Sequence, residues 1–269
     1  MNRIQKIIKV IAICLAIIII VNIFSALFYG LSLITDIDLN KENKDKITFK
    51  ETYEKIERIE VDAVSSNIII RIGDSFKVEA QNIKNNFSSN KKRKTLEIEE
   101  STGLFNKNKG NGKIIIEIPK ETELEELKID TGAGKFEITD ITAKEFEMNH
   151  GAGLLNITNS NFKESDIDGG AGEINISSST LNNLELDAGI GKINLEAEIT
   201  GNSKIECGVG EININLLGEK NNYSINTEKG IGTIKINGEN QSNSTTYGIG
   251  NNKLELEGGI GNINVNFKN

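Results

Sequence analysis

Five acidic or amide residues recur at every nineteenth position of one stretch of the chain, and their side chains could bind a cation. They are Asp130, Asn149, Asp168, Asp187 and Glu206. Carboxylate and amide oxygens are the ligands that Ca²⁺ takes in proteins. The same side chains also cap turns by hydrogen bonding to nearby backbone groups. Both interpretations stay open. We expect the capping role and assign no metal, cofactor-binding or catalytic residue.

A calcium-binding motif supports the first interpretation only in part. Residues 168–172 read Asp-Gly-Gly-Ala-Gly, whereas the calcium nonapeptide repeat reads Gly-Gly-x-Gly-x-Asp. Ile174 stands where that motif requires its Asp, and the repeat is one position longer than two nonapeptides. The motif is therefore incomplete.

The chain's one histidine and its one cysteine outside the apolar amino-terminal segment occupy the same position of the repeat. His150 and Cys207 share this position with Thr131, Gly169 and Ala188. A position that accepts five such different residues is structural rather than catalytic. Strand alternation turns it inward, where a cysteine behaves as a small apolar group.

The repeat itself is marked by glycine pairs that begin at residues 132, 151, 170, 189 and 208. A nucleotide-binding loop needs a third glycine and a following helix, but here each pair is followed by an alternating apolar pattern typical of a strand. If side chains alternate strictly from an inward Leu186, then Ala188 and Ile190 also point inward. Ile193 and Leu195 are apolar too, but the same alternation would point them outward. Gly191 can absorb the shift because glycine tolerates positive φ and bulges.

Such a short repeat cannot bury its own inner face, so it must stack on its neighbours. The sequence therefore predicts an all-β, single-stranded parallel β-solenoid, similar to a β-helix, with coils of about 19 residues. In-register stacking would align Glu173, Lys192 and Glu211 in one outward column of alternating charge. A second outward column consists of amides: Asn156, Asn175, Asn194 and Asn213.

One amino-terminal transmembrane helix is predicted before the solenoid. Residues 10–35 carry no charge and would span about 39 Å as a helix, more than the roughly 30 Å of a bilayer core. Basic residues precede this segment and acidic residues follow it, which favours a cytoplasmic tail at residues 1–9 and an extracytoplasmic remainder. A cleavable signal peptide is the alternative, although no small-residue cleavage site is evident.

The extracytoplasmic part is expected to have three regions. Residues 36–55 are polar and predict a stalk, residues 56–126 predict irregular β coils, and residues 127–269 predict the regular Gly-x-Gly solenoid. Leu254 to Phe267 resembles the last coil, which would leave an open end. The polar insertion Gly238 to Tyr247 would either shield this end or leave it free to pair with a strand of another copy or of a partner.

Charge and composition restrict the function. The formal net charge is −8, and three basic residues lie in the tail, so residues 10–269 carry −11. An acidic ectodomain repels nucleic acid, which makes another membrane or surface protein the expected partner. Self-association stays open as a second form of interaction. We expect that the protein is not an enzyme. A polysaccharide-acting β-helix enzyme and a purely structural surface spacer are the alternatives.

The coil from Ile59 to Ile70, the strand end Ile116-Glu117-Ile118-Pro119 and the Gly-x-Gly ladder together resemble the bacterial putative-adhesin family of unknown function. That family includes LiaG-like proteins and is related to the toastrack domains of envelope-stress membrane proteins. The resemblance covers roughly residues 52–269. It implies a β-solenoid at the cell surface that acts in adhesion or envelope-stress signalling, with no catalytic residue to carry over.

Overall fold

The computed structural model describes residues 47–83, 86–101 and 112–268, which all lie in one compact unit. The predicted transmembrane helix and the first part of the predicted stalk lie outside these residues. Within the described residues, no helix is long and apolar enough to span a membrane.

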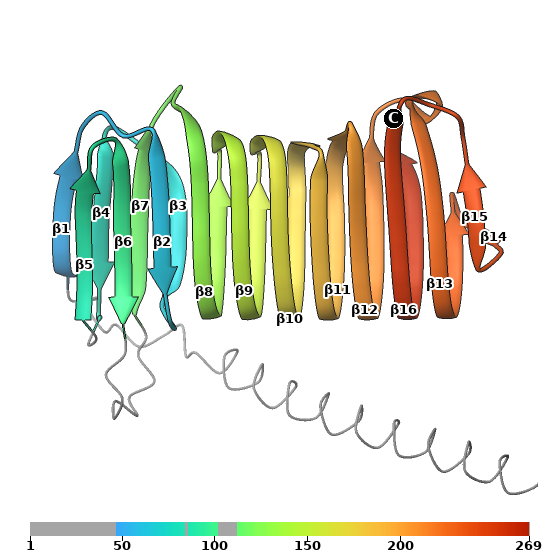
Figure 1. Cartoon of the computed structure of the whole chain (residues 1–269), viewed down its shortest axis with the longest axis horizontal. Coiled ribbons are helices and arrows are strands. Elements are labelled where there is room, and N and C mark those ends of the chain that lie inside the picture. The colour runs from blue at the N-terminus through green and yellow to red at the C-terminus, as the bar shows by residue number, and fades with distance from the viewer. Residues whose placement is uncertain (1–46, 84–85, 102–111, 269) are drawn as a thin grey trace, which may run out of the picture. The chain divides into compact units, whose positions relative to one another are not determined.

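Nearly all of the described chain is β-strand (Figure 1). The amino-terminal part contains short strands: β1 Ile47–Tyr53, β2 Arg58–Ala63, β3 Asn67–Gly73, β4 Phe76–Gln81, β5 Asn86–Lys92, β6 Thr95–Ser101 and β7 Lys113–Pro119. The remainder contains long strands with a carboxyl-terminal group of short elements: β8 Glu123–Thr139, β9 Thr142–Thr158, β10 Asn161–Asn182, β11 Leu184–Thr200, β12 Asn202–Leu217, the 3-10 helix η1 Lys220–Asn222, β13 Tyr223–Ile236, β14 Glu239–Gln241, β15 Ser244–Tyr247 and β16 Asn252–Lys268.

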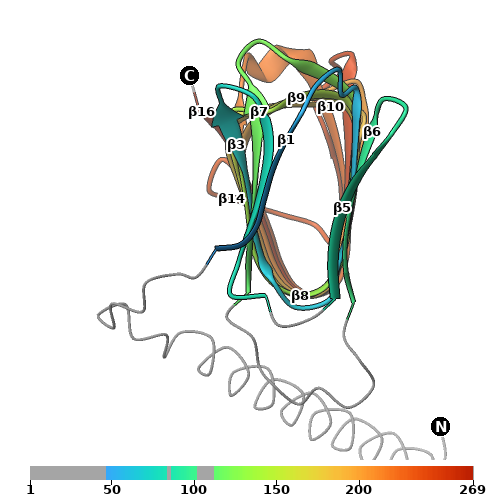
Figure 2. The same cartoon turned by 90° about the vertical axis from the view of Figure 1, so that its left-hand side faces the viewer.

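Each long strand is one coil of a parallel solenoid. It runs along one face, bends at its Gly-x-Gly and returns along the opposite face, as the end-on view in Figure 2 shows. Neighbouring coils pair in parallel and are offset by one sequence repeat, so that Asp168 lies opposite Asp187 and Glu173 opposite Lys192. Lys192 in turn lies opposite Glu211. The predicted fold class and the predicted charge column are confirmed for this part of the chain.

The core lies between the two faces. Leu186, Ile193 and Leu195 are each at most 2% exposed, and their equivalents in the other coils pack with them in one continuous cluster. Fully burying one such side chain contributes about 1.5–3 kcal/mol. The parity change at the bend is real, but Ile190 is only partly buried. The expectation that it turns inward with Leu186 is therefore wrong, because the backbone already curves at this residue.

The glycines are required because stacked backbones approach closely at the bend. Gly191 has φ 154°, and a Cβ there would lie 1.8 Å from the carbonyl oxygen of Gly172 in the coil before. No real Cβ tolerates such a contact. Coil-to-coil contact, more than backbone torsion alone, therefore fixes glycine at this position.

The amino-terminal region begins as an irregular coil, as predicted. β2 and β3 together pair with the two halves of β8, with Ile59 opposite Leu127 and Ile70 opposite Ile138. Beyond them the pairing changes, because β6 and β7 form the next layer and the antiparallel strands β5, β4 and β1 close the two faces. The stalk predicted for residues 36–55 is wrong for residues 47–53, which form β1 and pair with β4.

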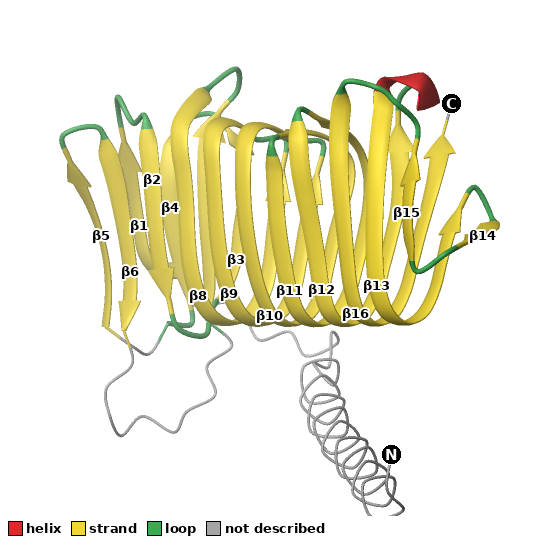
Figure 3. Ribbon diagram, turned by 45° about the vertical axis from the view of Figure 1, so that its right-hand side comes forward, coloured by secondary structure: helices red, strands yellow, loops and turns green. Residues whose placement is uncertain are grey.

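The carboxyl-terminal coils do not follow chain order. β16 lies between β12 and β13 (Figure 1), so Leu254 to Phe267 is an interior layer and not the open last coil. The end layer is β13, and the insertion predicted as a polar loop pairs with it in antiparallel fashion through β14 and β15 (Figure 3). These two short strands shield the end of the solenoid.

Candidate functional site: the glycine corner

The acidic column lies beside the bend, one side chain per coil. Strand register aligns the five predicted residues and extends the column at both ends, giving Asp62, Asp130, Asn149, Asp168, Asp187, Glu206, Glu257 and Glu228. Asn149 Nδ2 donates a hydrogen bond of 2.8 Å to Asp130 Oδ1. Asn149 thus bonds to the side chain in the preceding coil, so the predicted capping of backbone groups is wrong for this residue.

Like charges stacked in this way repel each other. Burial raises the pKa of Asp187, and the carboxylates of Glu206 and Asp168 raise it further. Lys204 relieves the repulsion nearby because its ammonium group pairs with both Glu206 and Glu257. These two ion pairs raise the pKa of Lys204.

The spacing of the column does not gather ligands around one point. Among the described residues, no group of three or more His, Cys, Asp or Glu side chains could hold a metal ion. Each coil contributes one carboxylate or amide, and consecutive coils are about 4.8 Å apart. The column is a linear row of charge.

The position shared by His150 and Cys207 faces the interior, as its strand parity predicted. His150 is 4% exposed, its ring centroid lies 6.0 Å from that of Phe136, and neither ring nitrogen has a hydrogen-bond partner in the described residues. Burial lowers the pKa of His150 and raises the pKa of the Cys207 thiol. Both groups are therefore uncharged parts of the core near neutral pH.

Sequence reasoning missed one member of this interior row. Lys229 is 6% exposed, and its Nζ donates a hydrogen bond of 3.2 Å to the carbonyl oxygen of Gly261. Burial lowers its pKa. Lys229 immediately precedes Gly230-Ile231-Gly232, as His150 and Cys207 precede their own glycine pairs, so the repeat pattern itself carried the signal.

The middle residue of each Gly-x-Gly forms an apolar row along the outer edge of the bend, which the sequence reading also missed. The row is in register and contains Ala133, Ala152, Ala171, Ile190, Val209, Ile260 and Ile231. Its side chains become larger toward the carboxyl-terminal layers, where Ile260 is 41% exposed and Ile231 is 68% exposed. We name this set the corner row.

Two shallow grooves follow the bend beside the acidic column, lined by that column, by the interior position next to it and by the first glycine of each pair. The first has a volume of about 560 Å³ and is lined by residues from Asp62 to Gly189. The second has a volume of about 620 Å³ and is lined by residues that include Asp187, Glu206, Glu228 and Glu257. Both grooves include Asp187 and Gly189, so one continues into the other along the solenoid.

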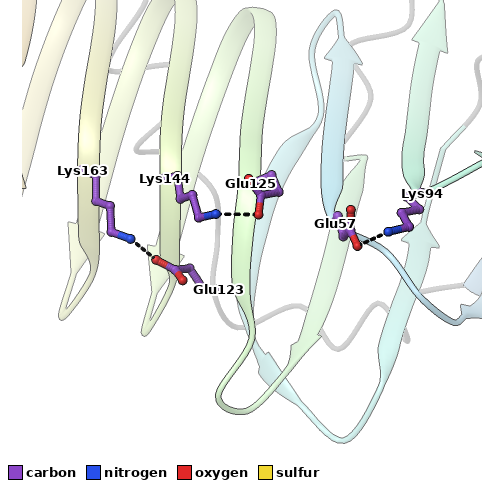
Figure 4. A network of polar contacts seen from close by, with 6 residues as sticks. All are labelled: Glu57, Lys94, Glu123, Glu125, Lys144 and Lys163. Carbon is purple, nitrogen blue, oxygen red and sulfur yellow. Dashed lines mark hydrogen bonds and ion pairs between the residues drawn. The ribbon is translucent and has the colours of Figure 1, made fainter.

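Away from the bend, the outward faces are occupied by side-chain ladders. The predicted amide column is confirmed and includes one further residue, because Asn264 donates to Asn213, Asn213 to Asn194, Asn194 to Asn175 and Asn175 to Asn156, over 2.8–3.2 Å. Ion pairs cross between coils on the other face, including Lys144 with Glu125 at 2.7 Å and Lys163 with Glu123 at 2.6 Å (Figure 4). Such exposed pairs contribute little energy each.

Several solved structures of bacterial proteins match this chain. A putative cell adhesion protein from Clostridium sporogenes is 20% identical, with a TM-score of 0.36 over 84% of this chain and 100% of that one. A putative adhesin from Bacteroides fragilis is 14% identical, with a TM-score of 0.39 over 81% and 95%. A putative lipid binding protein from Parabacteroides distasonis is 15% identical, with a TM-score of 0.41 over 83% and 97%.

No curated protein sequence matches this chain. The family model described as Toastrack DUF4097 matches residues 56–258, which include β2 to β15 and the start of β16. Because this match extends over most of the chain, the protein belongs to the Toastrack DUF4097 family.

Proposed function

We propose that this chain is a membrane-anchored, extracytoplasmic, non-enzymatic binding module that acts in adhesion or as an envelope-stress scaffold. The uncharged segment at residues 10–35 would be the anchor, with the amino terminus in the cytoplasm. The solenoid would then present its surfaces outside the membrane to another membrane or surface protein.

The corner row carries this proposal. Ile231 and Ile260 are large apolar side chains that remain 68% and 41% exposed in adjacent layers. Contiguous apolar side chains bordered by polar residues mark interaction sites, because covering them removes apolar area from water. The acidic column beside them favours a partner whose contact surface is apolar with a basic border.

The partner assay uses the fragment of residues 45–269, which is a single compact unit. Membranes from cells that lack the protein are titrated with the labelled fragment. Saturable binding that free fragment competes away is expected. If the fragment does not bind above the level of an unrelated acidic protein, the module is a structural spacer rather than a binding protein.

A polysaccharide-acting enzyme is the second candidate, and one observation favours it. The second groove is lined by the carboxylates of Asp187, Glu206, Glu228 and Glu257. Burial raises the pKa of Asp187, and Glu206 pairs with Lys204. Glycoside hydrolysis uses a pair of carboxyl groups, one of which acts as the acid and therefore benefits from a raised pKa. We rank it lower because the same one-carboxylate-per-coil pattern continues along the whole column. Release of reducing ends from acidic or neutral glycans, lost in Asp187→Asn, would establish it.

A further inference from the structure

β16 occupies a layer between β12 and β13 that the earlier strands of the chain leave unfilled. Strands β8 to β12 stack in chain order, but β13 occupies the second layer after β12 and not the first. β16, the last strand in the sequence, fills the layer between them. We call this layer the β16 slot.

The sequence shows how the chain steps over the slot. Consecutive glycine pairs from Gly132 to Gly208 are one repeat apart, whereas Gly230 follows Gly208 by one repeat and three further positions. Three additional residues extend up to about 10 Å, enough to pass one further layer of about 4.8 Å. The helix η1 lies in this connection, between the end of β12 and the start of β13.

The slot is selective for the strand that enters it. A Cβ at Gly261 would lie 1.5 Å from the carbonyl oxygen of Gly210 in β12. A strand with a side chain at that register cannot pass the bend. The slot also aligns Asn264 with the amide of Asn213, and it buries Leu256 and Val265 completely. The occupant must therefore carry Gly-x-Gly with alternating apolar residues on both sides.

The link that precedes β16 is short and exposed. Residues 248–251 connect β15 to β16, Ile249 is 99% exposed and Gly248 has φ 78°. Gly250 N donates one backbone hydrogen bond of 3.0 Å, to the carbonyl oxygen of Tyr223. Extension of these four residues would span about 13 Å without disturbing the ladder between β13 and β15.

We propose that the β16 slot is an interaction site for a second copy of this chain, whose β16 enters it in exchange for the resident strand. The exchanged strand would make the same contacts as the resident one. The closed and exchanged forms would therefore differ in free energy mainly through the link and the local concentration of chains. Crowding of anchored chains on one membrane would favour exchange. This inference rests on the proposed display outside the membrane and specifies self-association as one binding mode.

Crosslinking between two single-cysteine copies tests the exchange directly. Glu211 in β12 lies opposite Asn262 in β16. In full-length chains whose Cys14 and Cys207 are replaced by Ala, one copy carries Glu211→Cys with one tag, and the other carries Asn262→Cys with a second tag. The two copies are coexpressed and treated with a mild thiol oxidant. Because a closed monomer contains one cysteine, a disulfide joining both tags reports β16 of one copy against β12 of the other.

The matched control replaces Glu211→Cys with Glu173→Cys, which lies in the same column two coils earlier. We expect the amount of doubly tagged dimer to be at least severalfold higher than in this control and to increase with expression level. Deletion of Ile249 and Gly250 shortens the link, strains the closed form and is expected to raise the dimer several times further. If neither the native nor the shortened link gives a dimer above the control, the exchange does not occur.

The outcome is separable from that of the proposed function. Loss of the mixed dimer with retained binding to membranes would overturn the exchange alone. A mixed dimer without binding to membranes from cells that lack the protein would overturn the hetero-partner proposal and leave self-association.

Discussion

Asn264 Nδ2 donates a hydrogen bond of 2.8 Å to Asn213 Oδ1, although 51 residues separate the two in the chain. The other steps of the same amide ladder join residues one repeat apart. The side chain of Asn264 thus continues a pattern set by coils that come much earlier. This relationship shows that β16 is a full member of the solenoid, although it follows both neighbouring layers in the sequence.

The bend should tolerate no side chain at its second glycine. We expect Gly191→Val to lower the free energy of unfolding by at least about 2 kcal/mol, because its Cβ would overlap the carbonyl oxygen of Gly172. The neighbouring substitution Ile190→Val keeps a β-branched residue in the exposed row and is the control. Thermal melting of residues 45–269 measures both. Equal melting temperatures would show that the coils can separate at the bend without cost.

The interior position of β16 predicts a large cost for truncating its buried side chains. Leu256→Ala removes a side chain that is fully buried between β12 and β13, and should destabilise the fragment by about 2–5 kcal/mol. Ile249→Ala, in the exposed link, should change stability by less than about 0.5 kcal/mol. Urea titration of both variants is the measurement. Similar effects of the two substitutions would contradict the insertion of β16.

Acidification should destabilise the solenoid through His150. Burial lowers the pKa of this histidine in the folded state, so the unfolded chain binds the proton more readily. The stability given by the neutral ring is complete above the unfolded pKa of about 6.5 and is lost as pH falls below it. His150→Thr places the residue of the preceding coil there and should remove this loss.

The contribution of His150 to the pH dependence of stability must be separated from the contribution of the carboxylates. The raised pKa values of Asp166 and Asp187 give the opposite sign, because protonation as pH falls removes the cost of burying the charged carboxylates and also relieves their repulsion by neighbouring carboxylates. This effect is common to wild type and His150→Thr, so the difference between their unfolding free energies isolates the histidine. Between pH 8 and pH 5, the unfolding free energy of the wild type should fall relative to that of His150→Thr. A constant difference would place the ring in contact with water or with a hydrogen-bond partner.

The charge asymmetry around residues 10–35 predicts the orientation of the chain. Protease added to intact cells after removal of outer layers should degrade the chain beyond Asp36, because that part is expected outside the membrane. Permeabilised cells provide the control for a protease-resistant fold. Protection in intact cells with degradation after permeabilisation would reverse the orientation.

The repeat made most of the fold predictable. A strict period determines which residues lie opposite each other, so the pairing of Asp168 with Asp187 follows from the sequence alone. β1 was less evident, although Ile47, Phe49 and Tyr53 alternate with polar neighbours. The mixed charge around these residues is typical of a polar stalk. Their pairing with β4 depends on antiparallel contacts that no repeat encodes.

Two features could not be predicted from the sequence and are seen only in the structure: the order of the last layers, and the corner row. Residues 254–267 have the pattern of any coil, so local sequence predicts a bent strand but not the layer that it occupies. The longer spacing before Gly230 was the available signal. Ile190 continues the inward alternation in sequence, but the backbone turns at this residue and exposes the row. Alternation alone cannot report such a turn.

The corner row as the partner surface is the central claim, and one binding comparison tests it. Ile231→Asp combined with Ile260→Asp places charge on the row, and Ile249→Asp makes the same change at an isoleucine outside it. In the membrane titration, we predict that the double variant weakens binding at least about tenfold while Ile249→Asp binds as wild type, with all three fragments showing matched melting curves. Unchanged binding of the double variant would contradict the claim.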